Sequence, residues 1–174
     1  MKSKQLIFVT ESNQQSKSDY MYIRAFIERF FVVDQNVRIV PIYMNGKGNF
    51  NSQTVEKKIG TAVKEYINGE SIVVYCYDTD SINSDPYHQE FDKQINDYCQ
   101  EKKYKIVYFC RDIEEVFVGK IIGKNEKKIT AERFLRSRNI EKIDPEKFKS
   151  VKKKEKTSNL YLVLSDILVA KESN

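Results

Sequence analysis

The segment SIVVYCYDTDSINSD, residues 71–85, decides the fold. Its first half is a run of β-branched and aromatic residues, which is typical of a strand buried on both faces. The run ends in two aspartates one residue apart, Asp78 and Asp80. Aspartate is common in turns, so the simplest interpretation is that these residues end the strand. A functional interpretation depends on which other residues reach the same edge of the sheet.

Similar segments precede and follow this strand, with amphipathic helices between them. Four strands are predicted, at residues 5–11, 37–44, 71–78 and 104–111. Pro41 favours an edge or strand-end position for the second of them. The alternation predicts an α/β fold with a four-stranded, mainly parallel sheet and helices on both faces. We expect this domain over residues 1–122, followed by a basic and helical extension over 123–174 that packs on the same domain.

Composition excludes several classes of protein. The chain has 174 residues, the usual size of one domain. No apolar stretch approaches the ~20 residues that cross a bilayer, and residues 1–12 lack the pattern of a secretory leader. Three scattered cysteines and one histidine argue against a disulfide framework and against a zinc site. We therefore expect a cytoplasmic protein that makes no membrane contact.

Positive charge is concentrated in one segment. Residues 120–156 contain fourteen Lys and Arg against six Asp and Glu, whereas the net charge of the whole chain is +5. Such a segment favours a polyanionic partner, although a solvated helix and loop would have the same composition. The candidate nucleic-acid-binding residues are Arg136, Arg138, Lys149, Lys152, Lys153 and Lys154.

Carboxylates follow three of the four predicted strands. Glu11 ends the first strand, Asp78 and Asp80 end the third, and Asp112, Glu114 and Glu115 come after the fourth. In a parallel sheet these strand ends share one edge, where open α/β sheets place their sites. Residues i and i+2 of a strand point to the same side, so Asp78 and Asp80 are expected to act together. Clustered carboxylates without a histidine or thiolate favour Mg²⁺ or Mn²⁺.

These residues resemble the TOPRIM domain, in which a first strand ends in glutamate and a third in Asp-x-Asp. The stretches IFVTES, SDYMYIRAF and RDIEEVFVG look most like the small RloB and OLD-like TOPRIM proteins of bacterial defence systems. The resemblance covers roughly residues 5–120. It implies a metal-dependent nuclease that hydrolyses phosphodiesters, on DNA rather than RNA. It also suggests an ATPase partner, and the apolar segment 159–170 is expected to contact that partner or a second copy.

The resemblance also implies roles for individual residues. Glu11 would be a metal ligand and general base, and Asp78 and Asp80 would hold Mg²⁺ or Mn²⁺. Glu115, or Glu114, would complete a second metal, although acidic residues also favour the start of a helix. Lys120 would neutralise the scissile phosphate, or it is a surface lysine.

Three departures from the pattern leave alternatives open. Ser12 stands where the family has glycine, the linker from Glu11 to Asp19 is longer than the family pattern, and the sequence SIN follows the Asp-x-Asp step. A degenerate TOPRIM-like adaptor that binds nucleic acid or a protein is the main alternative, and a flavodoxin-like small-molecule binder is another. A receiver domain would need further acidic residues after the first strand. His88 could shuttle protons, but we interpret it as a solvent-exposed residue at a helix start. Residues 45–51, NGKGNFN, lack the phosphate-loop pattern and are interpreted as a plain loop.

Overall fold

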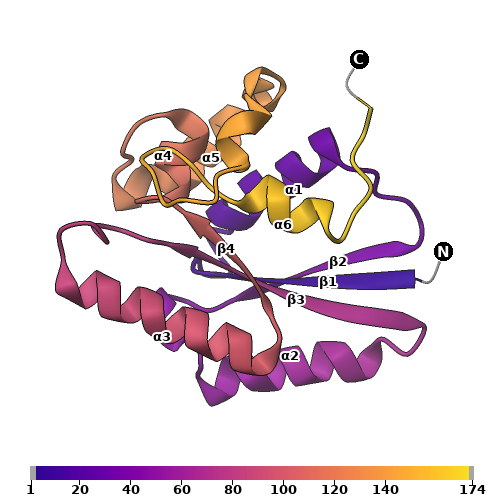
Figure 1. The fold of residues 1–174 in the computed structure, drawn as a ribbon. Helices are drawn as coiled ribbons and strands as arrows, with labels where there is room; N and C mark the ends of the chain where they lie inside the picture. The colour runs from indigo at the N-terminus through magenta and orange to yellow at the C-terminus, as the bar shows by residue number, and fades with distance from the viewer. Residues whose placement is uncertain (1–2, 173–174) are drawn as a thin grey trace.

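The computed structural model describes residues 3–172 and contains one four-stranded sheet in these residues. The strands are β1 Ser3–Thr10, β2 Val37–Tyr43, β3 Gly69–Asp78 and β4 Lys105–Phe109. All neighbouring strands pair in parallel, in the order β2-β1-β3-β4 (Figure 1). The predicted α/β class and parallel sheet are confirmed. Pro41 lies in the edge strand β2, where its missing N–H removes no bond from the centre of the sheet.

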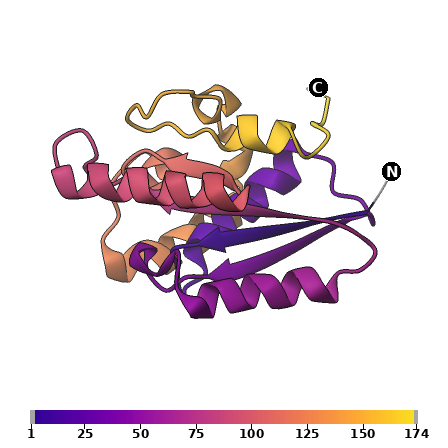
Figure 2. The ribbon, with the colours of Figure 1, turned by 60° about the horizontal axis from the view of Figure 1, so that its bottom comes forward.

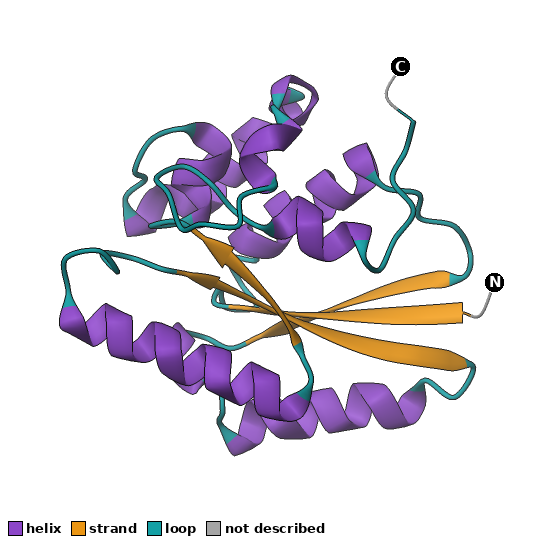
Figure 3. Ribbon diagram, viewed as in Figure 1, coloured by secondary structure: helices purple, strands orange, loops and turns teal. Residues whose placement is uncertain are grey.

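Helices cover both faces of the sheet, as predicted (Figure 3). One face is covered by α1 Ser18–Phe30 together with α4 Ile113–Val118, α5 Lys127–Arg136 and α6 Leu160–Ser165. The other face is covered by α2 Gln53–Glu65 and α3 Pro86–Lys102, which lie in front of the sheet in Figure 2. The two faces therefore have separate hydrophobic cores.

The C-terminal extension contributes to the first of these cores. Phe148 and Leu160 are fully buried against Phe26 of α1, and the rings of Phe26 and Phe148 lie 4.5 Å apart. The extension also protects the edge strand β4, because Ser158 forms an antiparallel bridge with Phe109. A charged, irregular segment along an edge strand prevents pairing with other chains. No helix within residues 3–172 is long and apolar enough to cross a membrane.

Local chemistry explains where the helices begin and end. The Ser52 hydroxyl accepts the Val55 N–H at the start of α2, and Asp85 caps α3 with Pro86 in the first turn. Asp112 caps α4 by accepting the Glu115 N–H at 2.7 Å. Gly119 ends α4 with a φ of 86°, a conformation that glycine adopts without strain.

Several strand ends differ from the predicted ones by one or two residues. The third strand was expected to begin at residue 71, but β3 begins at Gly69. A Cβ at Gly69 would lie 1.9 Å from the Ser3 carbonyl oxygen, so a close approach of two strands requires glycine here. The fourth strand ends at Phe109, two residues before the predicted end at residue 111. The reason is that the Cys110 N–H donates a hydrogen bond to the Thr157 carbonyl, at 2.9 Å.

Candidate functional site

Two of the predicted site residues meet at the carboxyl edge of the sheet. Glu11 directly follows β1, Asp78 ends β3, and these strands are neighbours. The Asp78 N–H donates a hydrogen bond to Glu11 Oε1 at 2.7 Å. Asp78 Oδ1 in turn accepts the Ile113 N–H, at 3.0 Å, from the first residue of α4. Three parts of the chain that are far apart in sequence, the ends of β1 and β3 and the start of α4, thus orient two carboxylates at one point.

A third carboxylate, Asp19, joins them from the first turn of α1. Its Oδ2 accepts the Ser12 N–H at 2.9 Å, and its Oδ1 accepts the Ser18 hydroxyl at 3.2 Å. Asp19 was not among the predicted site residues. The only indication in the sequence is that Asp19 lies in SDYMYIRAF, one of the stretches that carry the TOPRIM resemblance.

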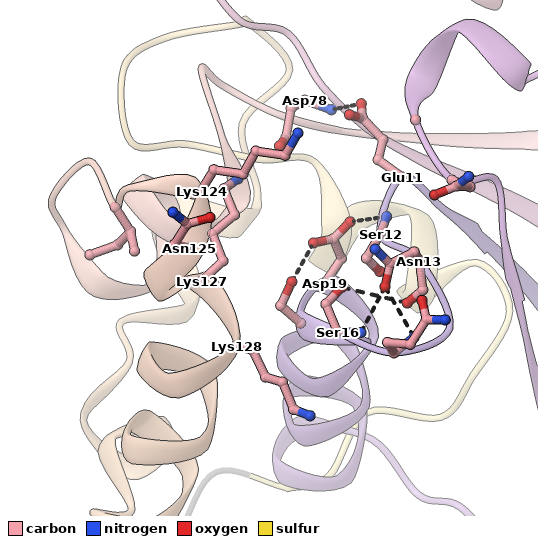
Figure 4. A pocket seen from close by; sticks show the side chains of 15 residues that line it. Glu11, Ser12, Asn13, Ser16, Asp19, Asp78, Lys124, Asn125, Lys127 and Lys128 are labelled. Carbon is pink, nitrogen blue, oxygen red and sulfur yellow. Dashed lines mark hydrogen bonds between the residues drawn. The ribbon is translucent and has the colours of Figure 1, made fainter.

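The three carboxylates line one wall of a cavity of about 750 Å³. The opposite wall is formed by the 3₁₀ turn Lys124–Glu126 and the start of α5, which contribute Lys124, Lys127 and Lys128 (Figure 4). The cavity therefore has an acidic wall from β1, β3 and α1, and a basic wall from the C-terminal extension. This arrangement suits a ligand that has both a cation and an anionic group.

Burial has large electrostatic consequences for the acidic wall. It raises the pKa of Glu11 from 4.5 to about 8, and the negative charge of Asp19 adds to the increase. Burial also raises the pKa of Asp19, and it raises the pKa of Asp78 well above its ordinary value, assisted by the charge of Glu11. Without a cation, this wall takes up protons at neutral pH.

Lys127, from the basic wall, forms an ion pair with the buried Glu114 of α4. Burial disfavours its charged form, but the carboxylates of Asp78 and Glu114 outweigh this effect and raise the pKa of Lys127. Its Nζ donates to Glu114 Oε2 at 2.8 Å. Glu114 is fully buried, and its Oε1 has no hydrogen-bond partner among residues 3–172. The fully charged Lys127 is therefore held beside the acidic wall by a buried carboxylate.

Asp80 does not line this cavity, so the structure does not bring it together with Asp78 as predicted. The strand ends at Asp78, and Asp80 has a φ of 50°, so the alternation of side chains within a strand no longer applies. The Asp80 carboxylate forms an ion pair with Lys47. The His88 Nδ1 lies 3.3 Å from the Lys47 Nζ. Four-fifths of the His88 side chain is shielded from solvent, so its interpretation as a solvent-exposed residue is wrong.

Two other predicted residues lie outside the cavity. Lys120 is exposed, because α4 ends at Gly119 and the chain turns outward there before the 3₁₀ turn returns Lys124 to the site. Glu115 is buried but faces Arg111, whose Nε lies 3.4 Å from Glu115 Oε2. Its neighbour Glu114 is the one that contacts a residue of the basic wall.

The predicted nucleic-acid-binding residues divide into two groups. Arg136, Arg138, Lys152 and Lys154 are exposed, and Arg138 also lies 4.0 Å from Glu141 Oε1 in an exposed ion pair. The other two already have carboxylate partners: Lys149 lies 2.6 Å from Glu146 Oε1, and Lys153 lies 2.6 Å from Asp92 Oδ2 on α3. Lys153 therefore attaches the loop to the domain, and fewer charges remain available to a polyanion than the composition indicates.

The chemistry of the acidic wall fits a hard divalent cation. Glu11, Asp19 and Asp78 supply carboxylate oxygens, and each is oriented through one oxygen by a backbone N–H. The second oxygen of Glu11 and that of Asp78 remain available. Within residues 3–172, no three Asp, Glu, His or Cys side chains are already drawn into one coordination shell. Binding would therefore require rotation of these side chains.

Comparison of the chain with models of protein families, with characterised proteins and with solved structures found no match.

Proposed function

We propose that this protein is a TOPRIM-like nuclease that hydrolyses phosphodiesters of nucleic acid with Mg²⁺ or Mn²⁺. The observation that supports this proposal best is the convergence of Glu11, Asp19 and Asp78 opposite a wall of lysines. A buried cluster of three carboxylates repels itself unless a cation neutralises it. A phosphodiester bound between the walls would place its charge next to the lysines.

Glu11, Asp19 and Asp78 would hold the cation. When bound, a divalent ion of this kind polarises phosphoryl oxygens and activates water. Because the pKa of Glu11 is about 8 without a cation, its carboxyl group holds a proton at neutral pH and releases it when the ion binds. Lys127, kept charged by Glu114, would contact the phosphate, and Lys124 and Lys128 would bind neighbouring phosphates.

The proposal extends to the biology that the TOPRIM resemblance implies. The substrate would be DNA rather than RNA, in a cytoplasmic defence against phages or mobile elements. An ATPase partner and a homodimer belong to the same proposal, with the exposed Arg136, Arg138, Lys152 and Lys154 tracking the phosphate backbone.

A degenerate adaptor is the second candidate, and one observation favours it. Asp80, which the TOPRIM resemblance assigns to the metal, is instead paired with Lys47. An adaptor would bind nucleic acid or a protein but would gain no stability from Mn²⁺.

Thermal unfolding with and without Mn²⁺ tests the proposal. A ligand that binds only the folded state raises Tm. We expect Mn²⁺ to raise the Tm of the wild type but not that of Asp78→Asn. The control Asp97→Asn, an exposed aspartate on α3, should respond like the wild type. Cleavage of labelled DNA in Mn²⁺ then separates the nuclease from the adaptor. If the wild type does not respond to Mn²⁺, the nuclease proposal is wrong.

A further inference from the structure

Lys47 forms a second charged cluster beside the cavity. It opens the 3₁₀ turn Lys47–Asn49 after β2, and only 17% of its side chain is exposed. Its ammonium group pairs with the Asp80 carboxylate and lies 3.3 Å from His88 Nδ1. It also lies 4.9 Å from the centre of the Phe91 ring, a cation–π distance. An ammonium group has only donors, so the ring nitrogen that faces it accepts.

The backbone holds Lys47 close to the acidic wall. The Gly46 N–H donates to the Glu11 carbonyl at 2.8 Å, and the Met44 N–H donates to the Thr10 carbonyl at 2.8 Å. The Asn49 side chain closes the turn by donating to the Met44 and Asn45 carbonyls, at 3.0 and 2.9 Å. The loop that contains Lys47 is therefore fastened to Glu11 itself.

Hydrogen bonds also fix the backbone around Asp80, the other member of the ion pair. Its N–H donates to the Arg111 carbonyl at 2.9 Å, and the Thr79 N–H donates to the Phe109 carbonyl at 3.0 Å. With a φ of 50°, the backbone at Asp80 leaves the direction of the strand. The carboxylate consequently meets Lys47 rather than Asp78. Lys47 directly follows Gly46, whose N–H donates to the Glu11 carbonyl, so the ion pair of Lys47 and Asp80 lies next to the acidic wall.

We infer that the Lys47 ammonium takes the place of a second divalent cation, so that this edge of the sheet binds a single metal ion. The inference rests on the proposed function, which requires that the acidic wall binds one ion. Two-metal sites hold their ions about 4 Å apart and share carboxylates between them. Here the carboxylate that would bind the second ion is already neutralised by a cation of the chain. Lys47 has three N–H donors, and after Asp80 and His88 one remains for a phosphate oxygen.

Counting bound Mn²⁺ tests the inference. Free Mn²⁺ is measured by electron paramagnetic resonance during titration of the wild type, Lys47→Met and Lys47→Arg. We expect a single bound ion for the wild type and for Lys47→Arg, which keeps the positive charge. Lys47→Met should bind a second ion, and the double variant Lys47→Met, Asp80→Asn should lose it again. The control Lys58→Met removes an exposed lysine of α2 that forms no ion pair within residues 3–172 and should keep a single ion.

Any other number of bound ions contradicts either the inference or the proposed function. If the wild type binds two ions, or if folded Lys47→Met still binds one, the inference is wrong while the proposed metal site stands. If the wild type binds no Mn²⁺, the proposed function fails first. Circular dichroism establishes that Lys47→Met is folded. If Lys47→Met does not fold, Asp80→Asn in the wild-type background is titrated with Mn²⁺ instead. Binding of a single ion with unchanged affinity supports the inference, and loss of that ion overturns the inference.

Discussion

Replacing Glu11 with glutamine should stabilise the metal-free protein, and the effect should depend on pH. Glutamine has the same shape as glutamate, and its Oε1 still accepts the Asp78 N–H that the wild type holds at 2.7 Å. What the substitution removes is a buried negative charge beside Asp19 and Asp78. The hydrogen bond is retained, so the change in the free energy of unfolding reports the charge.

The sign and size follow from the pKa of Glu11. In the unfolded chain this carboxyl loses its proton near its ordinary pKa of 4.5, whereas burial in the folded protein raises the pKa to about 8. Between these values the folded state binds more protons, so the wild type loses stability as pH rises from 4.5 to 8. At about 1.4 kcal/mol per pH unit, the total reaches about 5 kcal/mol. Glu11→Gln should match the wild type near pH 4.5 and exceed it increasingly up to pH 8.

Urea unfolding in EDTA, between pH 5 and about 8.5, measures this difference, and Asp97→Asn is the control. We expect Glu11→Gln to gain several kcal/mol relative to the wild type across this range, and the control to remain within about 0.5 kcal/mol. If the free energies of unfolding of the wild type and Glu11→Gln change with pH in parallel, the folded state does not raise the pKa of Glu11. The account of the acidic wall is then refuted.

Three further substitutions test other parts of the structure. Lys127→Met should cost about 3–5 kcal/mol of stability in urea unfolding, because it leaves Glu114 buried without its cation, and adding Glu114→Gln should recover most of the loss. An unchanged single variant would show that this pair is not buried in solution. Gly69→Ala should destabilise by about 1–3 kcal/mol, since the new methyl group would overlap a backbone carbonyl of β1. A neutral result would contradict the close strand pairing. Lys152→Ala should weaken binding to DNA and reduce its salt dependence by about one phosphate contact, whereas Lys153→Ala should lower stability instead, because its ammonium group pairs with a carboxylate on α3. Fluorescence anisotropy at several salt concentrations distinguishes the two, and equal effects on binding would refute the distinction.

Much of the fold follows from local patterns in the sequence. The apolar run that ends at Asp78 can be buried only between two layers of helices, so it predicts a central parallel strand. Pro41 predicts an edge strand because it lacks a donor. Strand ends in such a sheet share an edge, which is why the meeting of Glu11 and Asp78 could be predicted without any tertiary information.

The rest of the site depends on contacts between residues far apart in the chain. The direction of Asp80 is set by its left-handed backbone and by its hydrogen bond to the Arg111 carbonyl. Lys127 rather than Lys120 lines the cavity, because the chain turns outward after α4 and because the buried Glu114 pairs with Lys127. Composition cannot distinguish a free lysine from one that is paired with a distant carboxylate.

The sequence by itself thus determined the sheet, its two covered faces and the edge at which carboxylates gather, because periodicity and strand ends are local properties. Only the tertiary structure decided which carboxylates face the cavity and which are neutralised by the chain's own lysines. Those outcomes depend on side-chain directions beyond the last residue of a strand, where alternation ends and long-range hydrogen bonds and ion pairs determine the geometry.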